Sequence, residues 1–243
     1  MAHVMKPDEG LGEVWQETEE ALIKTIPVYD RGNQIMSFGR DRRYRREGIT
    51  QAVKRGDQVL DLGCGPGTMS QILLDTGEDI GGLVLADPLG PMLSVARVKV
   101  SADFAQMASG IFEYLPFRDD VFDVVMCGFS FRDAQSYQKA VEEMARVLKQ
   151  EDGRLLIVDL GKPDEQLRRG LIGLYFRFVA GVLTFLILGR KGLAFSRIYP
   201  TYRKYPTISR IRSLLESQFE NVTIETRMIG GVLIAIARQP KSK

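Results

Sequence analysis

The chain has 243 residues, and its 33 Lys and Arg against 31 Asp and Glu give a formal net charge of +2. This length is sufficient for a domain with a sizeable core. Such a small net charge does not produce the strong electrostatic attraction that a general nucleic-acid binder exerts on its partner, so no nucleic-acid partner is expected. Both cysteines, Cys64 and Cys127, lie in apolar surroundings, which argues against a disulfide framework. Because no metal-ligand spacing and no secretory pattern occur, we expect a cytoplasmic protein without a metal.

The N-terminal part predicts mostly helices. A helix-like stretch covers about Gly12–Lys24, Tyr29–Gly39 mixes turn residues with bulky apolar ones, and a basic helix covers about Arg40–Lys54. The cluster Arg40–Arg46 is interpreted as a solvated helix face, because few aromatic residues accompany it. RNA binding by this cluster is the alternative.

Strands and helices then alternate along the chain. Strands are predicted at Gln58–Leu62, Leu83–Ala86, within 102–112, at Val121–Cys127 and at Gly153–Asp159, and helices from Pro66 to about Asp75, at Pro91–Val100 and at Gln135–Lys149. This alternation predicts a parallel sheet with helices on both faces. Two final β-type runs, Val222–Thr226 and Val232–Arg238, predict a closing antiparallel hairpin.

The most apolar segment, Leu171–Gly189, lies before this hairpin between Arg168–Arg169 and Arg190–Lys191. Its uninterrupted run from Phe178 is shorter than the roughly 20 apolar residues of a bilayer span, so a helical insertion is expected rather than a membrane anchor. Three interpretations are open: a buried helix, a lid or membrane-surface helix over 168–191, and a homodimer interface.

The strongest local pattern is a glycine-rich turn between the first strand and the next helix. Gly63, Gly65 and Gly67 alternate there, and Asp61 precedes them. Glycine lets a ligand approach the backbone closely, and the helix N-terminus adds N–H donors. A dinucleotide turn has G-x-G-x-x-G spacing, and the carboxylate of Asp61 suits an ammonium group better than a pyrophosphate. The turn therefore predicts S-adenosyl-L-methionine, and a tight turn without a ligand is the alternative.

A second acidic residue, Asp87, ends the next predicted strand. An acidic residue about 20 residues beyond such a turn can accept the ribose hydroxyls. The two carboxylates and the turn together are more specific than any one of them. Met92 follows on a helix, where it packs in the core or against the cofactor.

From about Tyr29 to its end, the chain resembles the ubiquinone/menaquinone biosynthesis C-methyltransferase family (the UbiE type) among class I methyltransferases. The motifs that carry the resemblance occur in order: Tyr29-Asp30 through Asn33, Ile35–Gly39, Leu115–Phe117, Phe122–Val125, Gly128–Asp133, Gly161–Pro163 and Gly230–Val232. The resemblance implies an α/β, Rossmann-like fold with a mostly parallel seven-stranded sheet, an antiparallel C-terminal hairpin and helices on both faces.

The same resemblance implies function and site residues. It implies a methyltransferase dependent on S-adenosyl-L-methionine (product S-adenosyl-L-homocysteine) that acts on a lipophilic polyprenyl quinol ring in quinone biosynthesis. Another methyltransferase acting on oxygen or nitrogen of a small molecule or lipid is the alternative. Cofactor contacts are expected at Asp61, Gly63, Cys64, Gly65, Asp87, Pro88, Met92, Ile111, Phe112 and Gly128, and substrate contacts at Tyr29, Asn33, Met36, Phe129, Tyr199 and Tyr202. Capping of the apolar insertion is the alternative for Tyr199 and Tyr202.

The chain departs from the family's pattern at three positions: Ile111 replaces a frequent polar residue, Gly128 a serine and Asp133 an asparagine. Four units are expected: a helical cap on the substrate side at 1–55, the cofactor-binding core at 56–160, the apolar insertion at 161–206, and the last helix with the closing strands at 207–243.

Methylation of a ring carbon requires that a neighbouring hydroxyl ionise, which calls for a base or an oxyanion stabiliser. The only histidine, His3, is near the N-terminus. We hypothesise that Arg132 stabilises the phenolate, that Asp133 or a water bound to it takes the proton, and that Tyr29 hydrogen-bonds the ring. The alternatives are a surface ion pair for Arg132 and Asp133 and a core position for Tyr29.

Overall fold

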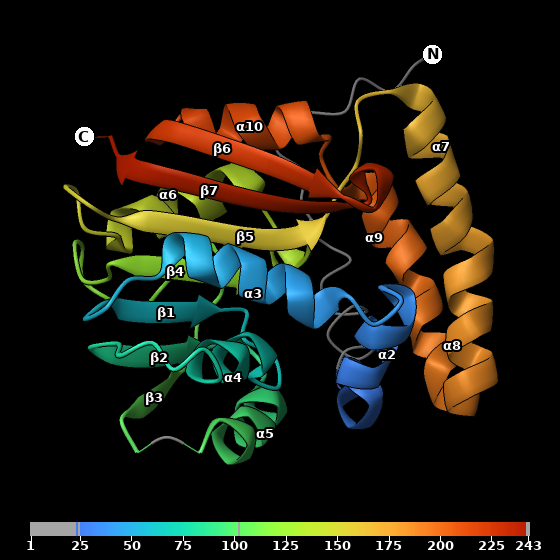
Figure 1. Cartoon of the computed structure of the whole chain (residues 1–243), viewed down its shortest axis with the longest axis horizontal. Helices are drawn as coiled ribbons and strands as arrows, with labels where there is room; N and C mark the ends of the chain where they lie inside the picture. The colour runs from blue at the N-terminus through green and yellow to red at the C-terminus, as the bar shows by residue number, and fades with distance from the viewer. Residues whose placement is uncertain (1–22, 24, 102, 242–243) are drawn as a thin grey trace.

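The computed structural model describes residues 23, 25–101 and 103–241, which form a three-layer α/β/α arrangement around one sheet (Figure 1). The sheet has seven strands in the order β3-β2-β1-β4-β5-β7-β6. Their bounds are β1 (Gln58–Leu62), β2 (Gly82–Ala86), β3 (Ala105–Ala108), β4 (Val124–Gly128), β5 (Arg154–Leu160), β6 (Phe219–Arg227) and β7 (Val232–Pro240). β1 to β5 pair in parallel, and β7 is antiparallel to both β5 and β6. The predicted fold class is confirmed.

Helices cover both faces of the sheet. One face carries α3 (Asp41–Ala52), α4 (Thr68–Leu74) and α5 (Gly90–Val100), and the other carries α6 (Tyr137–Val147) and α10 (Ile208–Glu216). Strand side chains alternate between the two resulting cores: Val59 packs in the first and Leu60 in the second. All seven side chains of β5 are buried, as expected for a central strand.

Two predicted segments differ from the structure. The strand predicted at Val121–Cys127 begins at Val124, because the N–H groups of Val121 and Phe122 bond to the carbonyl of Val147 before the chain pairs with β1. The turn-rich segment after residue 28 forms α2 (Tyr29–Met36), which follows a short 3₁₀ turn, η2 (Ile26–Val28). The helix predicted over 12–24 lies almost entirely outside the described residues.

Between β5 and α10 the chain forms a helical insertion. It comprises α7 (Gln166–Leu174), the π-helical stretch η4 (Tyr175–Ala180), α8 (Gly181–Leu188), the 3₁₀ segment η5 (Gly189–Arg197) and α9 (Ile198–Lys204). The continuous helix Gln166–Gly192 has 27 residues and is long and apolar enough to cross a membrane by length and composition. The helix is longer than the uninterrupted apolar run from Phe178, because helical structure also includes the residues before that run, among them Arg177.

The insertion packs against α2 at two points. The Tyr175 hydroxyl donates a hydrogen bond of 2.8 Å to the carbonyl of Met36 at the end of α2. The Phe195 ring lies against Gly32, where an added Cβ would stand 1.9 Å from the ring. Glycine at this position therefore lets the ring approach the helix backbone, and the insertion and α2 form one packed unit beside the sheet (Figure 1).

Candidate active site

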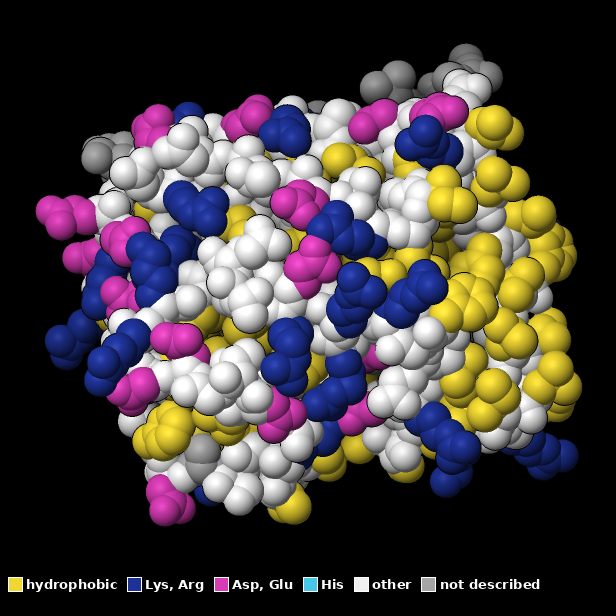
Figure 2. Space-filling view, in the orientation of Figure 1, with side chains coloured by type: hydrophobic (Ala, Val, Ile, Leu, Met, Phe, Trp, Pro, Cys, Tyr) yellow, Lys and Arg dark blue, Asp and Glu magenta, His cyan; other side chains and the backbone are white. Residues whose placement is uncertain are grey.

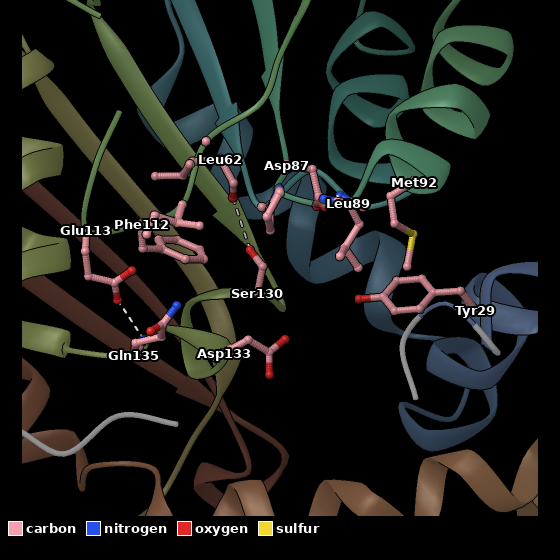
Figure 3. Close-up of a pocket in the computed structure, with 15 residues that line it drawn as sticks. Tyr29, Leu62, Asp87, Leu89, Met92, Phe112, Glu113, Ser130, Asp133 and Gln135 are labelled. Atoms are coloured by element: carbon pink, nitrogen blue, oxygen red, sulfur yellow. Dashed lines mark hydrogen bonds between the residues drawn. The ribbon is translucent and has the colours of Figure 1, made fainter. Parts of the chain in front are cut away.

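A cavity opens at the carboxyl ends of β1, β2 and β4. This edge is the usual ligand site of parallel α/β sheets. Figure 3 shows the wall, and the Tyr29 hydroxyl points across the cavity toward Ser130 and Asp133. The lining residues are Tyr29, Leu62, Gly63, Gly65, Asp87, Pro88, Leu89, Met92, Gly110, Ile111, Phe112, Glu113, Ser130, Asp133 and Gln135.

The glycine-rich turn forms the floor of this first cavity. Gly63 has a φ of 64°, and a Cβ there would lie 2.7 Å from the Ser130 hydroxyl oxygen. A larger residue would thus be strained and would push the opposite wall away. The Gly65 N–H donates a 2.8 Å hydrogen bond to Oδ2 of Asp87, so the turn and the end of β2 are fixed to each other.

Asp87 is held at the wall as predicted for a ribose-binding carboxylate. Its Oδ1 accepts a 2.9 Å hydrogen bond from the Leu89 N–H, and the residue is 6% exposed. Burial raises the pKa of Asp87, and the two amide donors oppose that shift. Because a carboxylate oxygen has two acceptor sites, both oxygens can also accept a ligand hydroxyl. The geometry fits the ribose of S-adenosyl-L-methionine.

Replacing Asp87 by asparagine is expected to weaken binding of S-adenosyl-L-methionine about 10- to 100-fold. The amide has a single acceptor oxygen, so the Gly65 or Leu89 N–H faces an NH₂ group, and a charged hydrogen bond contributes about 1.5–3 kcal/mol. Titration calorimetry measures the effect, with Asp79→Asn as control, because Asp79 is 75% exposed and pairs with Arg55. Equal affinities for Asp87→Asn and wild type would remove Asp87 from cofactor binding.

The remaining wall is largely apolar. Met92 packs with Leu89 and Tyr29 in a small buried cluster and also lines the cavity. Its contact with the cofactor stays a prediction. Ile111 and Phe112 form the side where adenine is expected. Glu113 is the polar residue next to them, but its Oε1 already accepts the N–H groups of Gln135 and Ser136. Because these two donors engage only Oε1, Oε2 of Glu113 still has lone pairs that can accept a donor on the adenine side of the cavity.

Three predicted cofactor residues do not line the cavity: Asp61, Cys64 and Gly128. Asp61 is fully buried, and its Oδ2 accepts hydrogen bonds from the Ser70 N–H (3.0 Å) and hydroxyl (2.6 Å). Its Oδ1 has no partner among the described residues, and burial raises the pKa of Asp61 to about 6. A Cβ on Gly128 would point at the Met69 sulfur, 3.0 Å away. Direct contact of these three residues with the cofactor stays a prediction.

The loop after β4 carries the predicted catalytic pair in a short 3₁₀ turn, η3 (Phe131–Asp133). Nη1 of Arg132 donates to the Phe129 carbonyl at 2.5 Å and to Oδ1 of Asp159 at 3.3 Å. Nε of Arg132 lies 3.7 Å from the Asp133 carboxylate, and both side chains are at most 12% exposed. The alternative of a surface ion pair is therefore wrong.

The electrostatics of this group follow from burial and pairing. Burial raises the pKa of Asp133 to about 6, although the Arg132 charge opposes the shift. Burial alone would lower the pKa of the Arg132 guanidinium. The nearby carboxylates of Asp133 and Asp159 together have the larger effect, so the pKa of Arg132 is raised. Burial also raises the pKa of Tyr29. Near neutral pH the site thus has a cation, a carboxylate that titrates close to neutrality, and a protonated phenol.

Asp159 is a site residue that was not predicted from the sequence. It lies in β5, it is fully buried, and its Oδ2 accepts the Arg132 N–H at 3.0 Å. It precedes the last residue of its strand, so it repeats the acidic strand-end pattern of Asp61 and Asp87. That repetition is the sequence signal that could have identified it.

A second cavity lies on the other side of the loop after β4. It is lined by Asn33, Met36, Ser37, Asp41, Phe129, Arg132, Leu160, Tyr175, Phe176, Ile198, Met228, Gly231 and Val232. Three predicted substrate residues, Asn33, Met36 and Phe129, thus share one cavity. The predicted Tyr199 and Tyr202 line neither cavity: Tyr202 is buried against Phe176, and Tyr199 lies under Arg177.

Comparison with known proteins decides the family. The sequence profile of the ubiE/COQ5 methyltransferase family matches residues 16–239. The chain belongs to this family. The resemblance seen in the sequence is confirmed, and the protein is a methyltransferase with S-adenosyl-L-methionine as its methyl donor.

Individual relatives cover most of the chain. A demethylmenaquinone methyltransferase of Thermus thermophilus is 31% identical over 225 residues, which is 88% of this chain and 97% of that protein. A ubiquinone/menaquinone biosynthesis C-methyltransferase of Francisella philomiragia is 29% identical over 242 residues, covering 93% and 94%. These proteins are therefore close to this chain in length.

Solved structures agree on the fold. A SAM-dependent methyltransferase of Thermotoga maritima has a TM-score of 0.61 at 14% identity and covers 91% of this chain and 99% of its own. Another, from Aquifex aeolicus, has a TM-score of 0.57 at 17% identity and covers 86% and 98%. At such identities the likeness concerns the fold alone.

Proposed function

We propose that this methyltransferase methylates a ring carbon of a polyprenyl quinol in ubiquinone or menaquinone biosynthesis. The observation that carries the proposal is the buried Arg132–Asp133 pair, with Asp133 in the wall of the cofactor cavity. A ring carbon becomes nucleophilic when an adjacent hydroxyl loses its proton, and this pair provides an acceptor for the proton and a cation for the oxyanion. The names of the Thermus and Francisella relatives support a quinone precursor as the acceptor.

Each residue has a distinct part in this chemistry. S-adenosyl-L-methionine supplies, when bound, a methyl group activated by its sulfonium. Asp133, or a water held by it, takes the hydroxyl proton, and a pKa of about 6 leaves this carboxylate ionised at neutral pH. Once the ring carbon has taken the methyl group and S-adenosyl-L-homocysteine has left, the hydrogen on that carbon is lost as a proton and the oxygen regains one, so the ring is aromatic again and one proton is released overall. Arg132 stays charged and stabilises the phenolate, since Asp159 and the Phe129 carbonyl fix its guanidinium. Tyr29, whose pKa is raised, stays protonated and donates a hydrogen bond to the ring.

The acceptor class is tested by methyl transfer from labelled S-adenosyl-L-methionine. The acceptors are a prenylated demethyl-benzoquinol, a prenylated demethyl-naphthoquinol and, for the alternative of headgroup methylation, phosphatidylethanolamine. We expect label in a quinol and none in the phospholipid. Label in phosphatidylethanolamine alone would contradict the proposal and favour a lipid N-methyltransferase.

We also propose that the protein is cytoplasmic and peripheral to the membrane, with the helix Gln166–Gly192 on an anionic lipid surface. Figure 2 shows apolar side chains gathered over α7 and α8 at the right of the view. The exposed ones are Leu167, Leu171, Leu174, Phe178, Val179, Val182, Phe185, Leu186 and Ile187. Basic residues near both helix ends, Arg168 and Arg169 at one and Arg190 and Lys191 at the other, complement anionic headgroups.

Packing of this helix favours a position in the plane of the membrane surface. Ile172, Phe176, Ala180 and Thr184 recur every four residues and are buried against the rest of the protein. This buried stripe extends over most of the helix. If the helix crossed the bilayer, the elements packed against the stripe would therefore have to enter the bilayer as well. A helix with one face on the protein and one apolar face exposed fits the headgroup–acyl boundary.

Changing Phe178, Phe185 and Leu186 together to serine is expected to reduce flotation with phosphatidylglycerol vesicles at least tenfold, since each buried apolar side chain contributes about 1.5–3 kcal/mol. Val98→Ser is the control, because Val98 is 80% exposed on α5. Equal flotation of the triple variant and wild type would contradict membrane contact. A wild-type dimer that dissociates on the same substitutions would instead identify a second copy of the chain as the occupant.

A further inference from the structure

The two cavities are neighbours that share their dividing wall. The loop Phe129–Asp133 contributes Ser130 and Asp133 to the first cavity and Phe129 and Arg132 to the second. On α2, Tyr29 lines the first cavity, and Asn33, four residues later on the same helix face, lines the second. An acceptor ring placed between Tyr29 and Asp133 therefore lies at the border of the second cavity.

The dividing wall has a fixed conformation. Phe129 has a φ of 60°, which a bulky residue adopts only when its surroundings hold it. The Arg45 guanidinium stacks on the Phe129 ring at 4.7 Å and pairs with Asp41 at 2.8 Å, and both charged groups are buried. These contacts hold the wall between the two cavities in place.

One side of the second cavity is lined by polar groups and the opposite side by apolar groups. Asn33, Asp41 and Arg132 give it polar groups, and Asp41 and Arg132 are engaged in ion pairs. The Asn33 side-chain nitrogen is different: it is buried and makes no hydrogen bond of normal geometry in the described part of the chain, although it lies close enough to the Tyr29 hydroxyl to lower the pKa of that group. A buried donor without a partner costs about 1–3 kcal/mol, so it marks a position where a ligand acceptor atom would be stabilising.

The other side of the second cavity is formed by hydrocarbon and aromatic groups, among them Tyr175, Phe176, Ile198 and Met228. Tyr175 and Phe176 belong to the same continuous helix whose outward side carries the exposed apolar residues. The apolar side of the cavity is therefore next to the proposed membrane surface.

We propose that this second cavity binds the first isoprenoid units of the acceptor, with a ring oxygen accepting a hydrogen bond from the Asn33 amide. The inference rests on the proposed function, because it assumes a prenylated quinol as the acceptor. The tail then runs from the ring past Phe176 and Ile198 toward the outward face of the helix Gln166–Gly192. This path lets a quinol enter from the lipid while its hydrocarbon stays out of water.

The direct test is photocrosslinking of the wild-type protein. The probe is a demethyl-naphthoquinol that carries a diazirine on the first isoprenoid unit, added with S-adenosyl-L-homocysteine, and the modified residues are found by mass spectrometry. Crosslinks are expected at Phe176, Ile198 or Met228. Crosslinks only at the outward residues 182–187, or only around the first cavity, would overturn the assignment.

A variant gives an independent test. Ile198→Trp fills the cavity and is expected to raise the Kd of the tailed quinol at least tenfold, while the Kd of the same ring without a tail changes less than twofold. Val98→Trp adds the same bulk at an exposed site on α5 and should change neither value. Equal weakening of both ligands by Ile198→Trp, or no weakening, would overturn the inference.

These readouts are separate from turnover. A tailed quinol that binds and crosslinks in the second cavity without being methylated would support the binding site and contradict the proposed function. Methylation of quinols with no difference between tailed and tail-free ligands in either test would leave the proposed function standing and overturn this inference.

Discussion

Replacing Asp133 by asparagine is expected to lower kcat/KM at pH 8 by about 10²- to 10⁴-fold, the usual contribution of a positioned base. Wild-type kcat/KM is expected to rise with pH and to level off above about pH 6, because the Asp133 carboxyl has to be ionised to accept the proton. The asparagine variant should lack this inflection. A pH profile of kcat/KM for both proteins measures the effect.

The same substitution should stabilise the folded protein at alkaline pH. Burial raises the pKa of Asp133 from an ordinary 3.8 to about 6, so the folded state binds this proton more tightly than the unfolded state. The associated stability is present below about pH 4 and is lost as pH rises through 6. The amide introduced by Asp133→Asn is never ionised, so the variant should gain up to about 3 kcal/mol over wild type at pH 8.

Asp159→Asn is the matched control for Asp133→Asn, because Asp159 pairs with Arg132 but does not line the cofactor cavity. The charge of Asp159 raises the pKa of Asp133, so its removal should move the inflection to lower pH without abolishing it. An asparagine variant at position 133 that keeps both its rate and its inflection would exclude Asp133 as the base.

Replacing Arg132 by methionine is the second large effect that we expect. It leaves the buried carboxylates of Asp133 and Asp159 without their shared cation, which costs about 3–5 kcal/mol at pH 8. The loss should be smaller at pH 5, because both carboxyl groups then take up protons more readily. Denaturant unfolding at the two pH values measures the difference, and equal losses would show that the ion pairs do not contribute as described.

Catalysis by Arg132 is separated from stability with Arg132→Lys. Lysine keeps the charge but cannot reach the Phe129 carbonyl and Asp159 with one planar fork. We expect Arg132→Lys to bind S-adenosyl-L-methionine normally and to lose about 10- to 100-fold in kcat, and Arg132→Met to lose more than Arg132→Lys among folded molecules. Unchanged turnover in Arg132→Met would remove Arg132 from the mechanism.

The parts of the fold that sequence reasoning predicted are those with a local cause. Alternating apolar runs and glycine turns place β1 at Gln58–Leu62 and the closing strands near their observed bounds. The start of β4 and the helical state of Tyr29–Met36 depend on tertiary contacts, such as the Tyr175 bond to Met36, which have no local pattern. The insertion helix extends beyond the uninterrupted apolar run because charged residues such as Arg177 do not end it.

Some residues of the candidate site could be predicted from the sequence and others could not, for a similar reason. Gly63, Gly65 and Asp87 lie where a βα turn and a strand end must place them, and all three line the first cavity. The direction of the Asp61 side chain, toward Ser70 rather than the cavity, depends on strand alternation that a motif does not encode. The role of Asp159 depends on a pairing with Arg132 across 27 residues of sequence.

The atom that receives the methyl group is the most direct test of the central claim. The protein is incubated with ¹³C-methyl-labelled S-adenosyl-L-methionine and a prenylated demethyl-quinol, and the product is examined by NMR and mass spectrometry. We predict a single labelled methyl on a ring carbon next to a hydroxyl. A labelled methyl on a quinol oxygen, or no transfer although S-adenosyl-L-methionine binds, would contradict the claim.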